Sequence, residues 1–150
     1  MEQKEIISTV NRLIETSKDG EEGFRQAAEA VKDRELKSLF REFSQQRARF
    51  AAELQSEARH LGESKPETES STAGALHRAW INLKSAMTSG DDHAILAECE
   101  RGEDSAVREY EEALKTNLPA PLREIISRQY REIQSAHNSI KQLRDLAGVS

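Results

Sequence analysis

Carboxylate and imidazole side chains at helical spacing are the residues of this chain best suited to chemistry. Glu57 and His60 form a Glu-x-x-His step, which puts both groups on one face of a helix. Gln134 and His137 repeat the step with an amide in place of the carboxylate. In helical bundles that hold two metal ions, such steps combine with single glutamates from facing helices to bind iron or manganese. A metal centre is therefore one interpretation of this sequence.

Glu103 is the first candidate ligand, because it shares the inward-facing row of one predicted helix with Cys99 and Tyr110. Glu53 lies beside the apolar Leu54 of another predicted helix. Glu21 and Glu22 lie about one turn from the middle of the first predicted helix. The candidate ligands for iron or manganese are Glu103, His137, Glu53, Glu22 and Glu21.

Two features weigh against a complete two-ion centre. Counted in turns from the helix ends, Glu57 and His60 fall near one end of the predicted bundle, below Glu103 and His137, so they do not share an ion with them. Gln134 is also neutral where such a centre needs a carboxylate. A protein without any metal cofactor therefore remains an equal alternative.

An ion pair explains the same residues without a metal. Arg47 interrupts the apolar row of its helix at nearly the height of Glu103, and a buried carboxylate beside a guanidinium is a satisfied pair. Cys99, the single cysteine, has no histidine near it in sequence, so we expect no catalytic nucleophile. In this interpretation a structural polar network contains Arg47, Glu103, Gln129 and Gln134.

Four long stretches must position these side chains, and each carries mainly apolar or small residues at alternating steps of four and three. This repeat is typical of helices that pack in a bundle. Gly20 lies on the first seam and either interrupts that helix or, like Gly102, allows close approach of two backbones. The seams are Ile6, Val10, Leu13, Ser17, Gly20, Phe24, Ala27 and Val31; Leu36, Phe40, Phe43, Arg47, Phe50, Leu54, Glu57 and Leu61; Ile95, Cys99, Gly102, Ala106, Tyr110 and Ala113; and Leu122, Ile126, Gln129, Ile133, Ala136, Ile140, Leu143 and Ala147.

The breaks between these stretches predict two helical hairpins joined by a crossover. Lys32 and Asp33 form the first turn, Gly62 ends the second helix, and residues 117–121 (NLPAP) separate the last two. Residues 63–72 read as an exposed loop and residues 73–89 as a short helix, with Asp91 or Asp92 capping the next helix. Helices of about 27–30 residues are about 40–45 Å long. The segment between the hairpins is long enough to travel that length, so both hairpins belong to one all-α four-helix bundle.

The composition of the chain limits the classes of partner that it is expected to bind. Residues 1–150 have the length of one domain, and 22 Lys plus Arg against 27 Asp plus Glu give a net charge of -5 without a basic run. We therefore expect no nucleic-acid or membrane partner, and a homo-oligomer or another protein remains the open choice. The start MEQKEIISTVNR lacks the pattern of a secretion signal, which favours the cytoplasm.

Several short motifs run along the chain in a fixed order. They are DGEEGF (19–24) with Ala27 and Ala28, FAAEL (50–54), GALHRAW (74–80), and ECERGED (98–104) with Tyr110, Gln129 and His137. With these motifs the chain resembles an uncharacterised bacterial family of ferritin-like four-helix-bundle proteins with a domain of unknown function. The resemblance implies ferritin-like topology with a short extra helix in the crossover, a link to stress physiology, and no established substrate. It also implies that Glu53, Glu103 and His137 are inward polar positions.

Two functions follow as expectations. The first is a structural, interaction or stress-associated bundle in which the polar network sets how the helices align. The alternative is a metalloprotein that stores iron or manganese, or reacts with oxygen or peroxide, at the inward glutamate and histidine residues.

Overall fold

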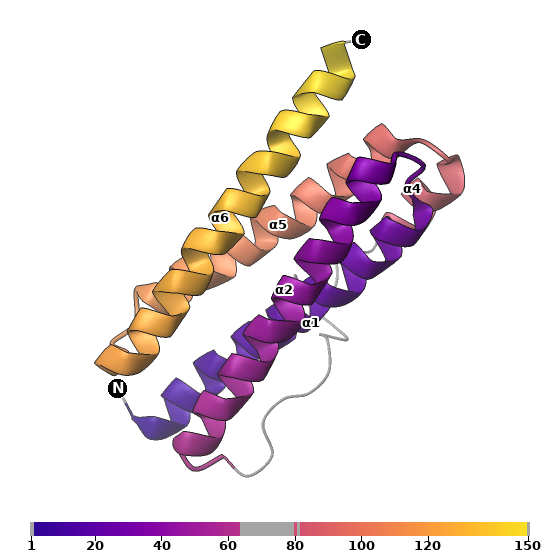
Figure 1. Cartoon of the computed structure of the whole chain (residues 1–150). Helices are drawn as coiled ribbons and strands as arrows, with labels where there is room; N and C mark the ends of the chain where they lie inside the picture. The colour runs from indigo at the N-terminus through magenta and orange to yellow at the C-terminus, as the bar shows by residue number, and fades with distance from the viewer. Residues whose placement is uncertain (1, 64–79, 81, 150) are drawn as a thin grey trace.

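The computed structural model describes residues 2–63, 80 and 82–149. Within these ranges the chain forms helices and turns without strands, so the all-α prediction is confirmed. The helices, labelled as in Figure 1, are α1 (Gln3–Ala30), α2 (Arg34–His60), α4 (Leu83–Ser89), α5 (Asp92–Leu114) and α6 (Ala120–Val149). The loop predicted at 63–72 and the helix predicted at 73–89 fall largely outside the described residues; their described part is Glu63, Trp80 and 82–89.

Local signals at the helix ends explain these boundaries. Asp33 caps α2 by accepting hydrogen bonds from the backbone N–H of Glu35 (2.8 Å) and Leu36 (3.2 Å). Gly62 ends α2 at φ +99° and Gly90 ends α4 at φ +70°, the left-handed region in which a side chain is strained. The stop at Gly62 was predicted correctly, and α4 ends at Ser89, the last residue of the predicted short helix.

The structure decides one open alternative and corrects one prediction about helix length. Of the two roles left open for Gly20, an interruption of the first helix is excluded, because α1 is continuous over 28 residues. The third long helix is shorter than the expected 27–30 residues: α5 has 23, because it begins at the Asp91 cap and ends before the Asn117–Pro121 break. Asp91 is the cap, accepting the N–H of His93 at 3.0 Å.

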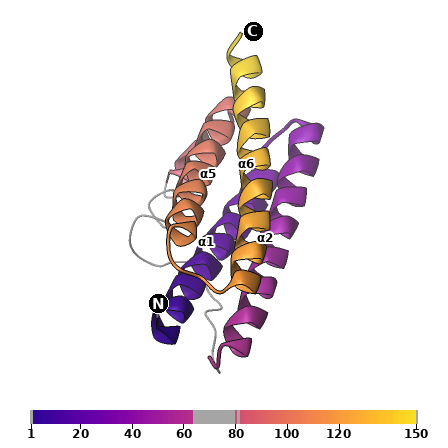
Figure 2. The same ribbon diagram turned by 90° about the vertical axis from the view of Figure 1, so that its left-hand side faces the viewer.

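Asp92 shows how the two hairpins are connected. Its carboxylate accepts the backbone N–H of Lys32 (2.9 Å) and of Asp33 (3.0 Å), so α5 begins beside the α1–α2 turn. The α5–α6 connection lies at the opposite end of the molecule, near the N-terminus (Figure 1). Because α2 also ends there, α5 begins at the end of the bundle opposite to the one where α2 ends. Figure 2 shows the two antiparallel hairpins side by side.

The apolar core is divided into two clusters along the bundle axis. Each long helix contributes to both, and each passes between them at a short central stretch. The cluster nearer the N-terminus contains Ile6, Val10, Leu13, Ile14, Phe50, Leu54, Ala58, Ala106, Tyr110, Ala113, Leu118, Leu122, Ile126 and Ile133. The cluster nearer the α1–α2 turn contains Phe24, Ala27, Ala28, Val31, Leu36, Phe40, Phe43, Leu83, Ala86, Ile95, Leu96, Cys99, Ala136 and Ile140.

Polar and glycine residues lie between the two clusters. On α2, Arg47 separates Phe43 from Phe50, and on α5 Glu103 separates Cys99 from Ala106. This central layer positions the candidate site. None of the described helices combines the length and apolar character needed to cross a membrane.

Candidate functional site

Arg47 and Glu103 form an ion pair at the centre of the bundle. The guanidinium Nη1 and Nη2 each lie 2.5 Å from one oxygen of the Glu103 carboxylate, a two-pronged contact between α2 and α5. Arg47 is 1% exposed and Glu103 0%. Arg47 Nε donates a further hydrogen bond to Gln46 Oε1 at 3.2 Å. The pairing expected from the equal heights of the two residues is present.

Gly20 makes room for the Arg47 side chain. A methyl group added at Gly20 would lie 3.2 Å from both Cγ and Nη1 of Arg47, which leaves little space for any side chain there. The ring of Phe24, one turn along α1, has its centroid 5.4 Å from Arg47 Cζ, the distance of a cation–π contact. The space beside Gly20 is therefore filled by a side chain and not by a neighbouring backbone, the other role that the sequence left open.

Trp80 lies against two further glycines. A methyl group at Gly23 of α1 would lie 2.6 Å from Cδ2 and Cζ3 of the indole, and one at Gly102 of α5 would lie 2.8 Å from Cδ2. Both separations are too short for real carbon atoms, so only glycine fits at either position. The Phe24 ring meets the indole edge to face, with centroids 5.3 Å apart and planes at 75°. We call Gly23, Phe24 and Gly102 the indole slot. It corrects the expectation for Gly102, which also faces a side chain.

A second buried network joins all four long helices. Tyr110 of α5 donates its hydroxyl hydrogen to Gln129 Oε1 of α6 at 2.7 Å, so the Ser17 hydroxyl of α1, at 3.3 Å, donates to Tyr110. Gln129 Nε2 donates to Glu53 Oε1 of α2 at 2.9 Å, and Arg128 pairs with the other oxygen of Glu53. Burial raises the pKa of Tyr110, so its hydroxyl stays protonated and serves as a donor.

His137 and Glu53 each have a partner away from Glu103. His137 Nε2 lies 2.5 Å from Asp104 Oδ1, on a partly exposed seam between α5 and α6. Glu53 is half-buried and is held by Gln129 and Arg128.

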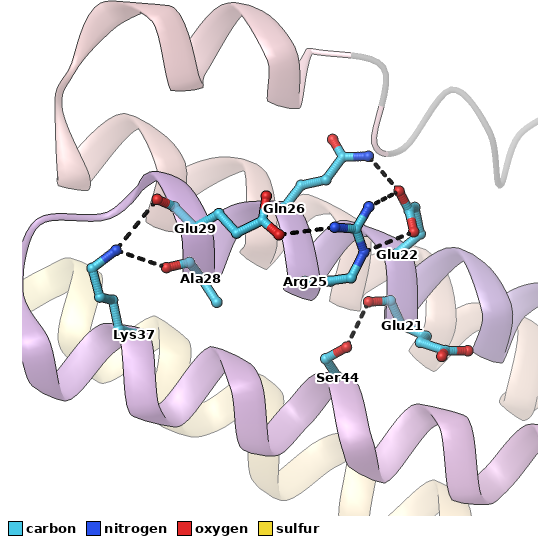
Figure 3. A network of polar contacts seen from close by, with 8 residues as sticks. All are labelled: Glu21, Glu22, Arg25, Gln26, Ala28, Glu29, Lys37 and Ser44. Atoms are coloured by element: carbon cyan, nitrogen blue, oxygen red, sulfur yellow. Dashed lines mark hydrogen bonds and ion pairs between the residues drawn. The ribbon is translucent and has the colours of Figure 1, made fainter.

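On α1, Glu21 is half-buried and Glu22 is exposed, and Figure 3 shows both with their polar neighbours. Glu22 accepts from Arg25 Nη2 at 2.5 Å and from Gln26 at 2.7 Å, and the Arg25 hydrogen bond, helped by Gln26, lowers the pKa of Glu22. The Glu21 carboxylate lies 3.3 Å from Lys18 Nζ, while its backbone carbonyl accepts from Ser44.

These donors do not fit a two-ion centre. Over residues 2–63, 80 and 82–149, no group of three or more His, Cys, Asp or Glu side chains is placed to hold a metal ion. Glu103, which would be the central ligand, faces a guanidinium. The Glu57–His60 step lies near the exposed end of α2, with 3.9 Å between the two side chains.

Gln134 is a correction to the predicted polar network. Its side chain lies on the exposed face of α6 and donates to the hydroxyl of Tyr130 at 2.9 Å. The buried position next to it is Ile133, and one residue turns the side chain by about 100° around the helix. Arg47, Glu103 and Gln129 are buried as expected.

Sequence reasoning missed a ladder of polar contacts along the outer side of the α5–α6 hairpin. The ladder has three pairs of residues. The α6 residues are seven positions apart, and their α5 partners follow in the reverse order along the chain, as expected for antiparallel helices. This reverse order, together with the complementary side chains, could have revealed the ladder from the sequence. The pairs are Glu111 with Tyr130, Asp104 with His137, and Glu100 with Arg144.

The fold and these contacts define an all-helical bundle protein with a buried ion-pair layer. The chain belongs to the family described as a domain of unknown function (DUF2383), which matches residues 5–116. The match includes the central layer and the indole slot, and it ends before α6, which carries Gln129 and His137. No curated protein sequence matches the chain.

Proposed function

We propose that this protein is a structural or interaction bundle of ferritin-like topology, in which the central polar layer fixes the alignment of the helices. The observation that carries the proposal is the two-pronged Arg47–Glu103 pair. It gives the most buried carboxylate of the central layer a protein cation as its partner.

Charge supports this role over metal binding. The guanidinium is positive at any physiological pH, so it neutralises Glu103 and repels a second cation at the same place. A divalent ion that replaced it would leave the Arg47 charge buried without a carboxylate, which costs about 3–5 kcal/mol in comparable pairs. The polar layer thus favours its own cation over a metal ion.

The same pair discriminates against wrong alignments of the hairpins. If α5 slid by one heptad relative to α2, Arg47 would face Leu96 or Tyr110 in place of Glu103. Either arrangement leaves a buried charge without its counter-ion, whereas the apolar positions would tolerate the slip. Buried polar groups are known to specify helix register in this way.

The connection between the hairpins supports the ferritin-like assignment. α1 and α2 form one antiparallel pair, α5 and α6 the other, and α5 starts at the α1–α2 turn. Bundles with one long crossover between two such pairs form the ferritin-like class. In this proposal the protein acts through its outer surface, which binds a second copy of the chain or another protein.

Metal loading tests the proposal against its alternative. Chelator-treated protein is incubated anaerobically with Fe(II) or Mn(II), passed over a desalting column and assayed for bound metal, and its thermal unfolding is followed with and without chelator. We expect no stoichiometric metal and unchanged unfolding. One or two retained ions per chain that disappear in Glu103→Gln, but not in the exposed control Glu112→Gln, would establish the metalloprotein and reject the structural proposal.

A further inference from the structure

The indole slot holds a flat ring between two helices that belong to different hairpins. Gly23 lies on α1 and Gly102 on α5, and a methyl group at either would overlap the Trp80 ring. Glycine at a mid-helix position lowers helix stability by about 1 kcal/mol relative to alanine. Two such glycines facing one ring, with the edge-to-face Phe24 beside them, make a gap with the thickness and shape of an aromatic bicycle.

Trp80 reaches this gap from outside the long helices. It lies in a turn just before α4, where its carbonyl accepts the N–H of Leu83 at 3.1 Å, and it is partly exposed. Solvent therefore reaches part of the residue that fills the slot. The slot walls, by contrast, are buried residues of the long helices α1 and α5.

We infer that the indole slot is a binding site for an uncharged, planar bicyclic aromatic compound, and that Trp80 is its tethered occupant. The walls contribute glycine backbone and an aromatic edge, which select for flatness and apolar character. A rigid apolar cavity left by removing a side chain binds a free molecule of the same shape. The inference is independent of whether the central layer binds metal.

The test uses the full chain with Trp80→Gly, which empties the slot, and indole as the probe. We expect saturable binding by calorimetry and a melting temperature that rises with indole concentration, because the ligand binds only the folded state. The matched control is Trp80→Gly with Gly102→Ala, in which the new methyl group occupies the empty gap. Indole should leave that variant unchanged, as should 1-adamantanol, which is apolar but not flat, with Trp80→Gly.

Indole that fails to bind Trp80→Gly, or binds the Gly102→Ala double variant equally well, would overturn the inference. If Trp80→Gly is unfolded alone, refolding in the presence of indole replaces the melting experiment: recovered helical circular dichroism supports the site and its absence rejects it. Gly102→Ala in the otherwise unchanged chain gives a second readout. Trp80 is the single tryptophan, so its expulsion from the slot must shift the fluorescence maximum to longer wavelength, and an unshifted spectrum also rejects the slot.

Discussion

The buried Arg47–Glu103 pair makes the centre of the bundle polar, between two apolar clusters. Both side chains are buried, so each is stable there only because the other is its ion-pair partner. Gly20 and Phe24 complete the arrangement by giving the guanidinium space and a ring face. A single change at either charged residue should therefore have a larger effect than the loss of one contact.

We predict that Glu103→Leu lowers the free energy of unfolding by about 3–5 kcal/mol, because it leaves the Arg47 charge buried without a counter-ion. The double variant Arg47→Met with Glu103→Leu should recover most of that loss, since two apolar side chains then fill similar volume. Urea unfolding measures both. The exposed substitution Glu112→Gln should change stability by less than about 0.5 kcal/mol. A double variant as unstable as the single one would show that charge burial is not the cause.

At the scale of the helices, short polar side chains decide where each begins and which element it meets. Asp91 and Asp92 are neighbours at the start of α5 but have separate tasks: Asp91 caps its own helix, and Asp92 binds the α1–α2 turn. Sequence reasoning treated them as alternatives for one cap. The distinction depends on which part of the chain lies opposite, which only the fold supplies.

Asp92→Ala should lower stability by about 1–2 kcal/mol, because two backbone N–H groups lose a carboxylate acceptor. It should also speed hydrogen exchange at the amides of Lys32 and Asp33, measured residue by residue by NMR. Asp91→Ala is the matched control: it removes a cap worth about 1 kcal/mol but should leave those two amides protected. Equal acceleration in both variants would contradict a direct link between α5 and the first turn.

At the scale of the whole molecule, the division into two apolar clusters ties the hairpins together at both ends. Cys99 lies in the cluster nearer the α1–α2 turn and is 0% exposed, and burial together with the Glu103 and Glu98 carboxylates raises the pKa of its thiol well above normal. A thiol that is both inaccessible and protonated reacts slowly with disulfide reagents. Cys99 is therefore a reporter of opening of the bundle.

We predict that Cys99 is unreactive toward a nitrobenzoate disulfide reagent in buffer and reacts fully in denaturing urea. Because only opened molecules expose it, the labelling rate should rise as stability falls, and Glu103→Leu should label faster than the parent chain. A Ser135→Cys variant in a Cys99→Ala background, with its thiol on the exposed face of α6, should react at once. Rapid labelling of Cys99 in native buffer would contradict a closed core.

Much of the architecture was predictable from the sequence because it depends on neighbours along the chain. The four-and-three spacing of apolar residues identifies the seams, and Gly62 identifies the end of the second helix. The Arg47–Glu103 pair was also predictable, because counting helical turns from the helix ends places the two residues at nearly the same height in the bundle. These features were open to prediction because the rise of a helix per residue is constant, so height along the bundle can be read from residue number.

Only the tertiary structure decided which partner each polar side chain has. Gln129 is buried and Gln134 exposed, His137 meets Asp104 and not Glu103, and Trp80 fits against Gly102. Height alone does not determine these contacts, because the direction of a side chain around its helix and the rotation of the facing helix matter equally. Both are set by packing between residues that are distant in the chain, so they are absent from any local pattern of the sequence.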